Sequence, residues 1–236
     1  MNEKYNDTAL HFDKLTLPGI LKRFLQSGPV SIADLGCGDG PWFNLLFKEG
    51  YISDEKTVFA VDLEIDRLRR VQDNFPWITV LACPADEIPM IKSGSLDWVI
   101  STMVMEHVLD EPKYIKEIAR LLKPHGKAYL STVYKRKWAW YFRKRHGESV
   151  LDTSHLREYA DLNEFKLLVT EKGGFTILAL QISQMWFPLF DPILFRVGKY
   201  IRLNKIVIKL LRMVKVPIPG YYELRTVFSK KASSAD

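Results

Sequence analysis

The stretch VSIADLGCGDGPWFNLLF, residues 30–47, decides the fold of this chain. Its first part, VSIADL (30–35), is short, apolar and rich in β-branched residues, which is typical of a buried strand. Glycines follow at alternate positions from 36 to 40, and Pro41 suits the first turn of a helix, where its missing N–H costs nothing. The stretch therefore predicts a strand, a tight glycine turn and a helix.

The same alternation of strand and helix patterns continues through the first half of the chain. The pattern predicts further buried strands, in chain order, at 57–62, 77–83, 95–101 and 126–133, with helices at 65–74 and 111–123. Such alternation indicates βαβ units and a mostly parallel sheet with helices on both faces. An amphipathic helix interrupted by Pro18-Gly19 is predicted ahead of them, at 9–26.

The second half is less regular. It contains a predicted helix at 159–172 and two predicted strands at 175–182 and 221–228. The rest forms two cap elements, a basic and aromatic connection at 134–158 and an insert at 183–220. The cations of the insert do not follow one stripe, so the insert is interpreted as two short helices broken near Leu203-Asn204. We expect one domain over 1–236.

Composition narrows the class of protein. The chain has 236 residues, 47% of them hydrophobic and 26% charged, which is ordinary for a globular domain. Two cysteines, Cys37 and Cys83, make neither a disulfide scaffold nor a zinc cluster, so no metal is predicted. The start resembles no secretory leader and no run of 18 apolar residues occurs. We therefore expect a cytoplasmic protein that meets a membrane only at its surface.

The net charge of +6 is concentrated in two segments. Residues 135–146 hold six Lys/Arg and residues 193–215 hold seven, and neither segment contains an acid; the remaining chain has 21 basic and 28 acidic residues. Such asymmetry usually reflects a partner. The aromatic residues within 135–146 fit a lipid–water interface, RNA, or a solvated loop packed on the core. The insert is either an interfacial anchor, a lid over an apolar substrate, or a helical cap that buries its apolar face.

Carboxylates follow the predicted strands at the edge where ligands of open parallel sheets bind. The glycines form the pattern GxGxG, since residue 41 is proline and the dinucleotide pattern GxGxxG fails. Asp62 ends the second strand, 22 residues after Gly40, where a carboxylate can accept both hydroxyls of a ribose or can cap a helix. Asp86 follows the third strand, where it can accept from an adenine amino group or form a turn.

These motifs together carry a family resemblance over roughly residues 28–182. The series ADLGCGDG (33–40), FAVDL (59–63), PADEIPM (84–90), SLDWVISTMVMEHV (95–108) and EIARLLKPHGKAYLSTV (117–133) resembles class I S-adenosylmethionine-dependent methyltransferases, type 11 branch. The resemblance implies a Rossmann-like, doubly wound α/β fold. It also implies a seven-stranded, mostly parallel sheet with one antiparallel strand, supplied by 221–228, to which the helical cap is added.

The resemblance also assigns a cofactor, S-adenosylmethionine, with S-adenosylhomocysteine as product. By its motifs, Asp62 binds the ribose with Leu63 against the adenine, and Asp86 with Ala85 holds the adenine amino group. The remaining residues implied around the methionine part and the sulfonium are Asp34, Gly36, Cys37, Gly38, Gly40, Ser101, Thr102 and Met103. Cys37 is interpreted as a small filler in the glycine turn.

Histidines supply the catalytic candidates. His107 follows the fourth strand, where cofactor and acceptor meet, and is the first candidate for a general base. Its neighbour Glu106 is expected to orient it, and a Glu-His pair in this family also fixes the loop without reacting. His155, in DTSHLREY, is the second candidate, because that loop is expected to fold over the pocket; a capping role is the alternative.

The sequence thus predicts an enzyme that methylates a small molecule or a glycan at oxygen. The apolar, basic insert suggests that this acceptor is carried on lipid. The first alternative is an RNA methyltransferase that uses the basic segments as a phosphate track, although nucleic acid is the less favoured partner. The second is a cofactor-binding partner subunit without transfer activity. The acceptor and the oligomeric state stay open.

Overall fold

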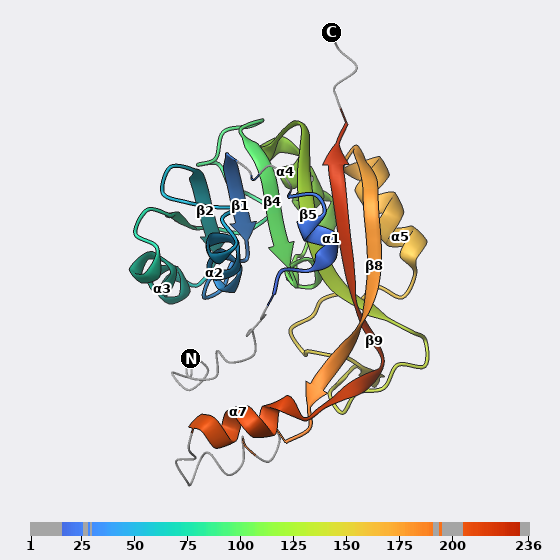
Figure 1. Ribbon diagram of the computed structural model, residues 1–236. Helices are drawn as coiled ribbons and strands as arrows, with labels where there is room; N and C mark the ends of the chain where they lie inside the picture. Colours follow the sequence, from blue (N-terminus) through green and yellow to red (C-terminus); the bar gives the residue numbers. More distant parts are fainter. Residues whose placement is uncertain (1–15, 26–27, 29, 191–193, 195–204, 232–236) are drawn as a thin grey trace.

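The computed structural model describes residues 16–25, 28, 30–190, 194 and 205–231 (Figure 1). A seven-stranded sheet with the order β3-β2-β1-β4-β5-β9-β8 forms its centre. The strands are β1 Ser31–Leu35, β2 Thr57–Asp62, β3 Thr79–Ala82, β4 Leu96–Thr102, β5 Leu122–Lys135, β8 Phe175–Pro188 and β9 Lys215–Lys230. The first five run parallel, and β9 is antiparallel to both of its neighbours. The predicted fold class is confirmed.

Helices cover both faces of the sheet. The apolar sides of α4 and α5 pack on one face, and those of α1, α2 and α3 pack on the other. Asp110 caps α4, because its Oδ1 accepts a hydrogen bond from the backbone N–H of Lys113 at 2.9 Å. The helices are α1 Gly19–Lys22, α2 Pro41–Lys48, α3 Ile65–Asn74, α4 Glu111–Leu121 and α5 Leu162–Leu167, which continues as a π-helical turn, Leu168–Lys172.

The helix predicted at 9–26 is too long over its described part, residues 16–25. Only α1, four residues long, is helical there, because Pro18 precedes it as its N-cap and the chain leaves the helix at Arg23. Residues 9–15 lie outside the described residues. The helix predicted from residue 159 begins at Leu162 instead, since Tyr159 is held in a β-bridge to Tyr134.

Where the structure describes it, the predicted insert 183–220 continues two strands at its ends and contains one helix between them. β8 and β9 continue to pair beyond the sheet, with Trp186 opposite Pro217 and Pro188 opposite Lys215. They project below the sheet and end at helix α7, Lys205–Met213 (Figure 1). Helix α7 is the second of the two helices predicted there, and the first falls almost entirely outside the described residues. We call residues 184–188 and 205–220 the arm.

The predicted connection 134–158 packs beside the arm. It contains a small hairpin of β6, Lys144–Arg145, and β7, Glu148–Ser149. The arrowheads of β1 and β4 point toward the end of the molecule that carries the arm and this connection (Figure 1). Within the described part of the chain, no helix is both long and apolar enough to cross a membrane.

Candidate active site

The glycine turn after β1 needs glycine for two reasons. Gly36, Gly38 and Gly40 have φ angles of 72°, 55° and 75°, a left-handed region that other residues rarely adopt. A Cβ on Gly36 would lie 2.3 Å from Cγ2 of Val104, in the loop that follows β4. The backbone at Gly36 therefore packs directly against the Val104 side chain, in the loop that follows the neighbouring strand β4.

Asp62 stands at the end of β2 beside this turn. Its Oδ2 accepts a hydrogen bond from the N–H of Gly38 at 2.8 Å, and its Oδ1 accepts from the N–H of Glu64 at 2.9 Å. The carboxylate is thus fixed in place, and each oxygen retains acceptor capacity for a ribose hydroxyl. Next to it Leu63 is 72% exposed, as an apolar support for a planar ring would be. The alternative of a helix cap is met only in part, because the N-cap of α3 is Glu64.

The other predicted cofactor residues lie along the same edge. Ser101 Oγ donates to the carbonyl of Leu35 at 2.7 Å, and Thr102 Oγ1 accepts from the Trp42 indole N–H at 2.9 Å. Both side chains therefore tie β4 to its neighbours. Met103 has a left-handed φ of 57°, and its N–H donates to the carbonyl of Ser131 at 2.8 Å. The cofactor roles of these residues stay predictions.

Two further predicted residues have a clear structural setting. Asp86, mostly buried and preceded by Ala85, has its Oδ2 3.7 Å from the ammonium of Lys113 on α4, so a salt bridge already holds it at this edge. Burial raises the pKa of the Cys37 thiol far above its ordinary value, and the side chain is 3% exposed. A thiol in this state is no nucleophile, which agrees with its interpretation as a filler. Asp34 is buried within β1.

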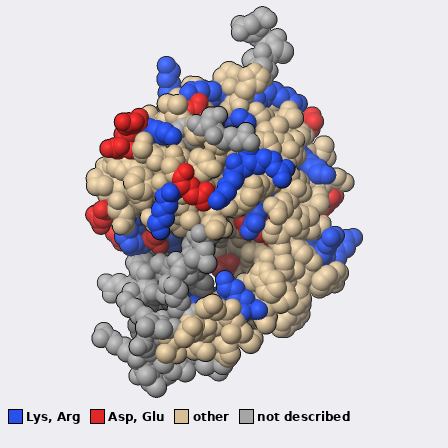
Figure 2. Space-filling view, in the orientation of Figure 1, with Lys and Arg blue, Asp and Glu red and all other residues tan. Residues whose placement is uncertain are grey.

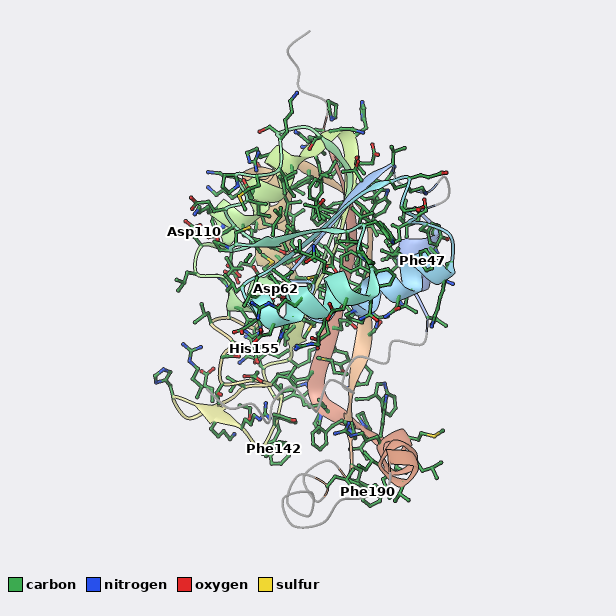
Figure 3. The ribbon with its side chains drawn as sticks, turned by 90° about the vertical axis from the view of Figure 1, so that its left-hand side faces the viewer. Phe47, Asp62, Asp110, Phe142, His155 and Phe190 are labelled. Atoms are coloured by element: carbon green, nitrogen blue, oxygen red, sulfur yellow. The ribbon has the colours of Figure 1, made fainter. Side chains whose placement is uncertain are left out.

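The three catalytic candidates meet at one place. Glu106 and His107 lie in a short turn after β4, and the backbone N–H of Leu156 donates to the carbonyl of Glu106 at 2.7 Å, which folds the later loop onto this turn. The rings of His107 and His155 lie 4.8 Å apart, edge to face. One side-chain donor atom from each of the three residues lies within 4.8 Å of the others. Figure 3 shows His155 below Asp62, toward the end of the molecule that carries the arm.

Glu106 is fully buried. Its Oε2 accepts a hydrogen bond from Thr132 Oγ1 at 2.8 Å, while Oε1 has no hydrogen-bond partner among the described residues. Burial raises the pKa of this carboxyl to about 7, because the ionised form loses the water that would stabilise it. Glu106 is thus balanced between its neutral and charged forms near neutral pH.

Glu158 belongs to this cluster, although the sequence interpretation omitted it. Its Oε1 lies 2.8 Å from Nδ1 of His155 and also accepts from the N–H of Leu151 at 2.7 Å, while the Lys135 ammonium stands 3.4 Å from Oε2. Burial alone would raise the pKa of Glu158, but these bonds and the ammonium hold it below its ordinary value. The ionised carboxylate can therefore fix the tautomer and direction of His155. The spacing H-L-R-E, three residues, was the available signal.

His107 is the more exposed histidine. Its Nδ1 lies 3.4 Å from the carbonyl oxygen of Ser154. Partial burial and the neighbouring His155 hold its pKa below the ordinary value. At neutral pH the ring is therefore neutral and can accept a proton, as a general base must.

Glu106, His107 and His155 also form a donor set of two imidazoles and one carboxylate, a type that zinc and iron accept. Around a tetrahedral zinc ion such atoms stand roughly 3.4 Å apart, whereas here their separations reach 4.8 Å. The donor atoms of these side chains would have to move closer together to bind a zinc ion. The prediction of no metal stays a prediction.

An open parallel sheet with a glycine turn after β1 and a fixed carboxylate after β2 defines a Rossmann-like domain for a nucleotide-type cofactor. Residues 33–130 match the family model described as "Methyltransferase domain". This match, over residues 33–130, supports a class I S-adenosylmethionine-dependent methyltransferase domain of the type 11 branch. The comparisons support the predicted family, the predicted enzyme class and S-adenosylmethionine as the cofactor.

Curated relatives are similar over the same part of the chain. A protein of Mycobacterium tuberculosis named "Probable S-adenosylmethionine-dependent methyltransferase" is 28% identical over 101 residues, 43% of this chain and 35% of the relative. A "Ubiquinone biosynthesis O-methyltransferase" of Acinetobacter baumannii is 29% identical over 125 residues, 51% of each chain. The chain thus spans about a third to a half of the length of these relatives.

Solved structures share the fold. An S-adenosylmethionine-dependent methyltransferase of Methanosarcina mazei matches with a TM-score of 0.62 at 16% identity, over 92% of this chain and 100% of that one. Phosphoethanolamine N-methyltransferase 2 of Haemonchus contortus, solved in complex with S-adenosyl-L-methionine, matches with a TM-score of 0.58 at 18% identity, over 90% of this chain and 51% of that one.

Proposed function

We propose that this chain transfers the methyl group of S-adenosylmethionine to an oxygen of a small-molecule or glycan acceptor that is carried on lipid. The observation that carries the proposal is the meeting of His107 with His155 and Glu158 at the same sheet edge as Asp62. The family match over residues 33–130 supports methyl transfer, and one group of similar proteins is named as O-methyltransferases.

The residues at the sheet edge fit the cofactor. The glycine turn lets a ligand approach the backbone, Asp62 presents a carboxylate held by two N–H groups, and Leu63 offers exposed apolar surface beside it. The bound cofactor supplies a methyl group already activated on a sulfonium. The protein's own work is to align the acceptor, exclude water and remove a proton.

His107 is the residue that we assign to proton removal. A neutral imidazole next to the acceptor takes the hydroxyl proton as the oxygen attacks, which contributes roughly 10²–10⁴-fold to the rate. His155 packs edge to face against the His107 ring and limits its orientation. Glu158 in turn holds His155, so it acts as a positioning residue.

One observation favours RNA as the alternative acceptor. A groove with a volume of about 520 Å³ runs along the connection, lined by four cations and by Trp138 and Trp140. Cations and indoles in one groove can pair with phosphates and stack on bases. The non-catalytic subunit is less favoured, because Asp62 and the histidine cluster are both assembled.

Cofactor labelled in its methyl group tests the proposal. The protein and an extract of its source cells are incubated with it, and the lipid, RNA and water-soluble fractions are separated. Label in lipid that disappears with His107→Ala supports the proposal, whereas label in RNA supports the alternative. No label in any fraction, with S-adenosylhomocysteine still bound in calorimetry, would indicate the non-catalytic subunit.

A further inference from the structure

The connection and the arm lie far apart in the sequence but meet at one end of the molecule. The backbone N–H of Arg136 donates to the carbonyl of Gly220 at 2.8 Å, and that of Trp140 donates to Pro219 at 3.1 Å. A Cβ on Gly220 would lie 2.6 Å from Cα of Ala139, so the two backbones touch. The connection and the arm therefore form one continuous surface.

Aromatic packing fixes the two segments to each other. The ring of Phe187 on β8 lies 5.9 Å from that of Tyr141 and 5.8 Å from that of Phe142. The hydroxyl of Tyr221 on β9 donates to the carbonyl of Ser149 at 2.7 Å. Tyr141 and Tyr221 are buried in this contact, whereas Phe142 remains 53% exposed.

Large apolar side chains project from this surface. Trp138 and Trp140 are 65% and 58% exposed. On α7, Val207, Leu210 and Met213 are 45%, 59% and 71% exposed, and their spacing of three residues places them along one side of the helix. The interpretation of this helix as a cap that buries its apolar side is therefore not what the described residues show. Exposed apolar groups gathered in one region usually mark an interaction site.

Exposed cations lie beside the two tryptophans of the connection. Arg136, Lys137, Arg143 and Lys144 are exposed on the connection, and Glu148 is the single acid between residues 135 and 149. In Figure 2 the described surface at the lower end of the molecule shows Lys and Arg among uncharged residues. Aromatic rings and cations around an apolar tip match the region between lipid headgroups and acyl chains.

We propose that the connection and the arm together dock this protein on an anionic lipid bilayer. The apolar tips of Trp138, Trp140 and α7 enter the interface, and the flanking cations meet the phosphate headgroups. An RNA strand would use the cations and indoles but would leave the aliphatic side of α7 in water, so the bilayer accounts for more of the surface. The inference does not depend on methyl transfer.

Docking in this way directs the candidate active site toward the membrane. The ends of β1 and β4 that carry the site face the same end of the molecule as the arm (Figure 1). An acceptor headgroup at the bilayer surface would then approach His107 without leaving its lipid.

The test is sedimentation of the full chain with vesicles. One set contains equal parts of phosphatidylcholine and phosphatidylglycerol, and the other contains phosphatidylcholine alone. The first variant is Lys137→Glu with Lys144→Glu, and the second is Leu210→Ser with Met213→Ser. We expect the wild type to prefer the anionic vesicles, and each double variant to lower its partition coefficient there roughly tenfold or more.

A matched control changes one cation and one exposed apolar residue away from this surface, Lys166→Glu with Leu167→Ser on α5, and should bind as the wild type does. Equal binding of the wild type to both vesicles, no binding to either, or unchanged binding of both variants would overturn the proposal. RNA binding is measured with the same proteins. If the wild type binds RNA but neither vesicle, and the Lys137→Glu with Lys144→Glu variant loses RNA binding, the surface binds RNA and the proposal is overturned. S-adenosylhomocysteine affinity, measured by calorimetry, confirms that the variants are folded and tests the cofactor site separately.

Discussion

The cofactor half of the candidate site consists of residues that directly end neighbouring strands, whereas the acceptor half depends on a connection that folds back over the sheet edge. The cofactor half, the turn at 36–40 with Asp62, is held by β1 pairing with β2 in register. The acceptor half, Glu106, His107, His155 and Glu158, joins segments that are distant in sequence. Strand order alone determines the position of the cofactor half, whereas the position of the acceptor half depends on tertiary packing.

This difference predicts that the two halves can be damaged independently. Replacing His107 by Ala removes the proposed base from the acceptor half and should lower kcat by roughly 10²–10⁴-fold. Affinity for S-adenosylhomocysteine should change little, since His107 makes none of the contacts that hold the turn or Asp62. Steady-state kinetics and calorimetry measure the two quantities, and His125→Ala, an exposed histidine near the start of β5, is the control. If His107→Ala lowers kcat and the affinity for S-adenosylhomocysteine equally, the two halves of the site do not act independently.

The comparison also explains what the sequence could predict. Strand and helix periodicity located the sheet, and the order of the motifs placed Asp62 at the turn because parallel strands end at one edge. The sequence predicted that the loop of His155 folds over the pocket, but not that its ring packs against that of His107. The spacing of His155 and Glu158 was a local signal for their contact. The ion pair of Glu158 with Lys135, in contrast, arises from tertiary packing.

The arm shows the same limit in another form. The pairing of Trp186 with Pro217 extends β8 and β9 beyond the predicted strands, although proline interrupts a strand pattern. The charge count indicated a partner for each basic segment but could not show that the connection and the arm form one surface. That fact depends on the packing of Phe187 and Tyr221, which no local pattern reports.

Glu106→Gln, in the acceptor half, should change how the free energy of unfolding of the protein depends on pH. The folded-state pKa of Glu106 is about 7, above the ordinary value of 4.5. Between these values the folded protein keeps a proton that the unfolded chain has released, so stability falls as pH rises through this window, by roughly 3 kcal/mol. Of the neighbouring charged groups, His155 lowers the pKa of this carboxyl and Glu158 raises it. The Gln variant should lose this decline.

Urea unfolding at the two ends of this pH window measures the effect. Glu55→Gln, which changes an exposed carboxylate, should unfold with the wild-type pH dependence. If the free energy of unfolding changes with pH equally in the wild type and in Glu106→Gln, burial does not raise the pKa of Glu106.

Asp62→Ala tests the cofactor half alone. It removes the carboxylate proposed for the ribose together with the acceptor of the Gly38 and Glu64 N–H groups. Hydrogen bonds to a charged group contribute about 1.5–3 kcal/mol each, so affinity for S-adenosylhomocysteine should fall by roughly a hundredfold. Asp66→Ala, an exposed carboxylate on α3, controls for the loss of charge. Unchanged affinity in the Asp62→Ala variant would refute the assignment of the ribose site.

The smallest expected effect tests whether the halves communicate through one contact. Gly36 and Gly50 both have left-handed φ angles, 72° and 76°, so replacement by Ala strains the backbone equally. A Cβ at Gly36 would meet Val104 at 2.3 Å, whereas nothing lies within 4 Å of one at Gly50. Val104 precedes Glu106 and His107, so Gly36→Ala must displace the loop that carries the acceptor half. We expect it to unfold at lower denaturant than Gly50→Ala, by about 2 kcal/mol in stability, and to lower kcat as well. If the two variants are equally stable and equally active, the cofactor turn does not position the histidines, and the halves share only the sheet.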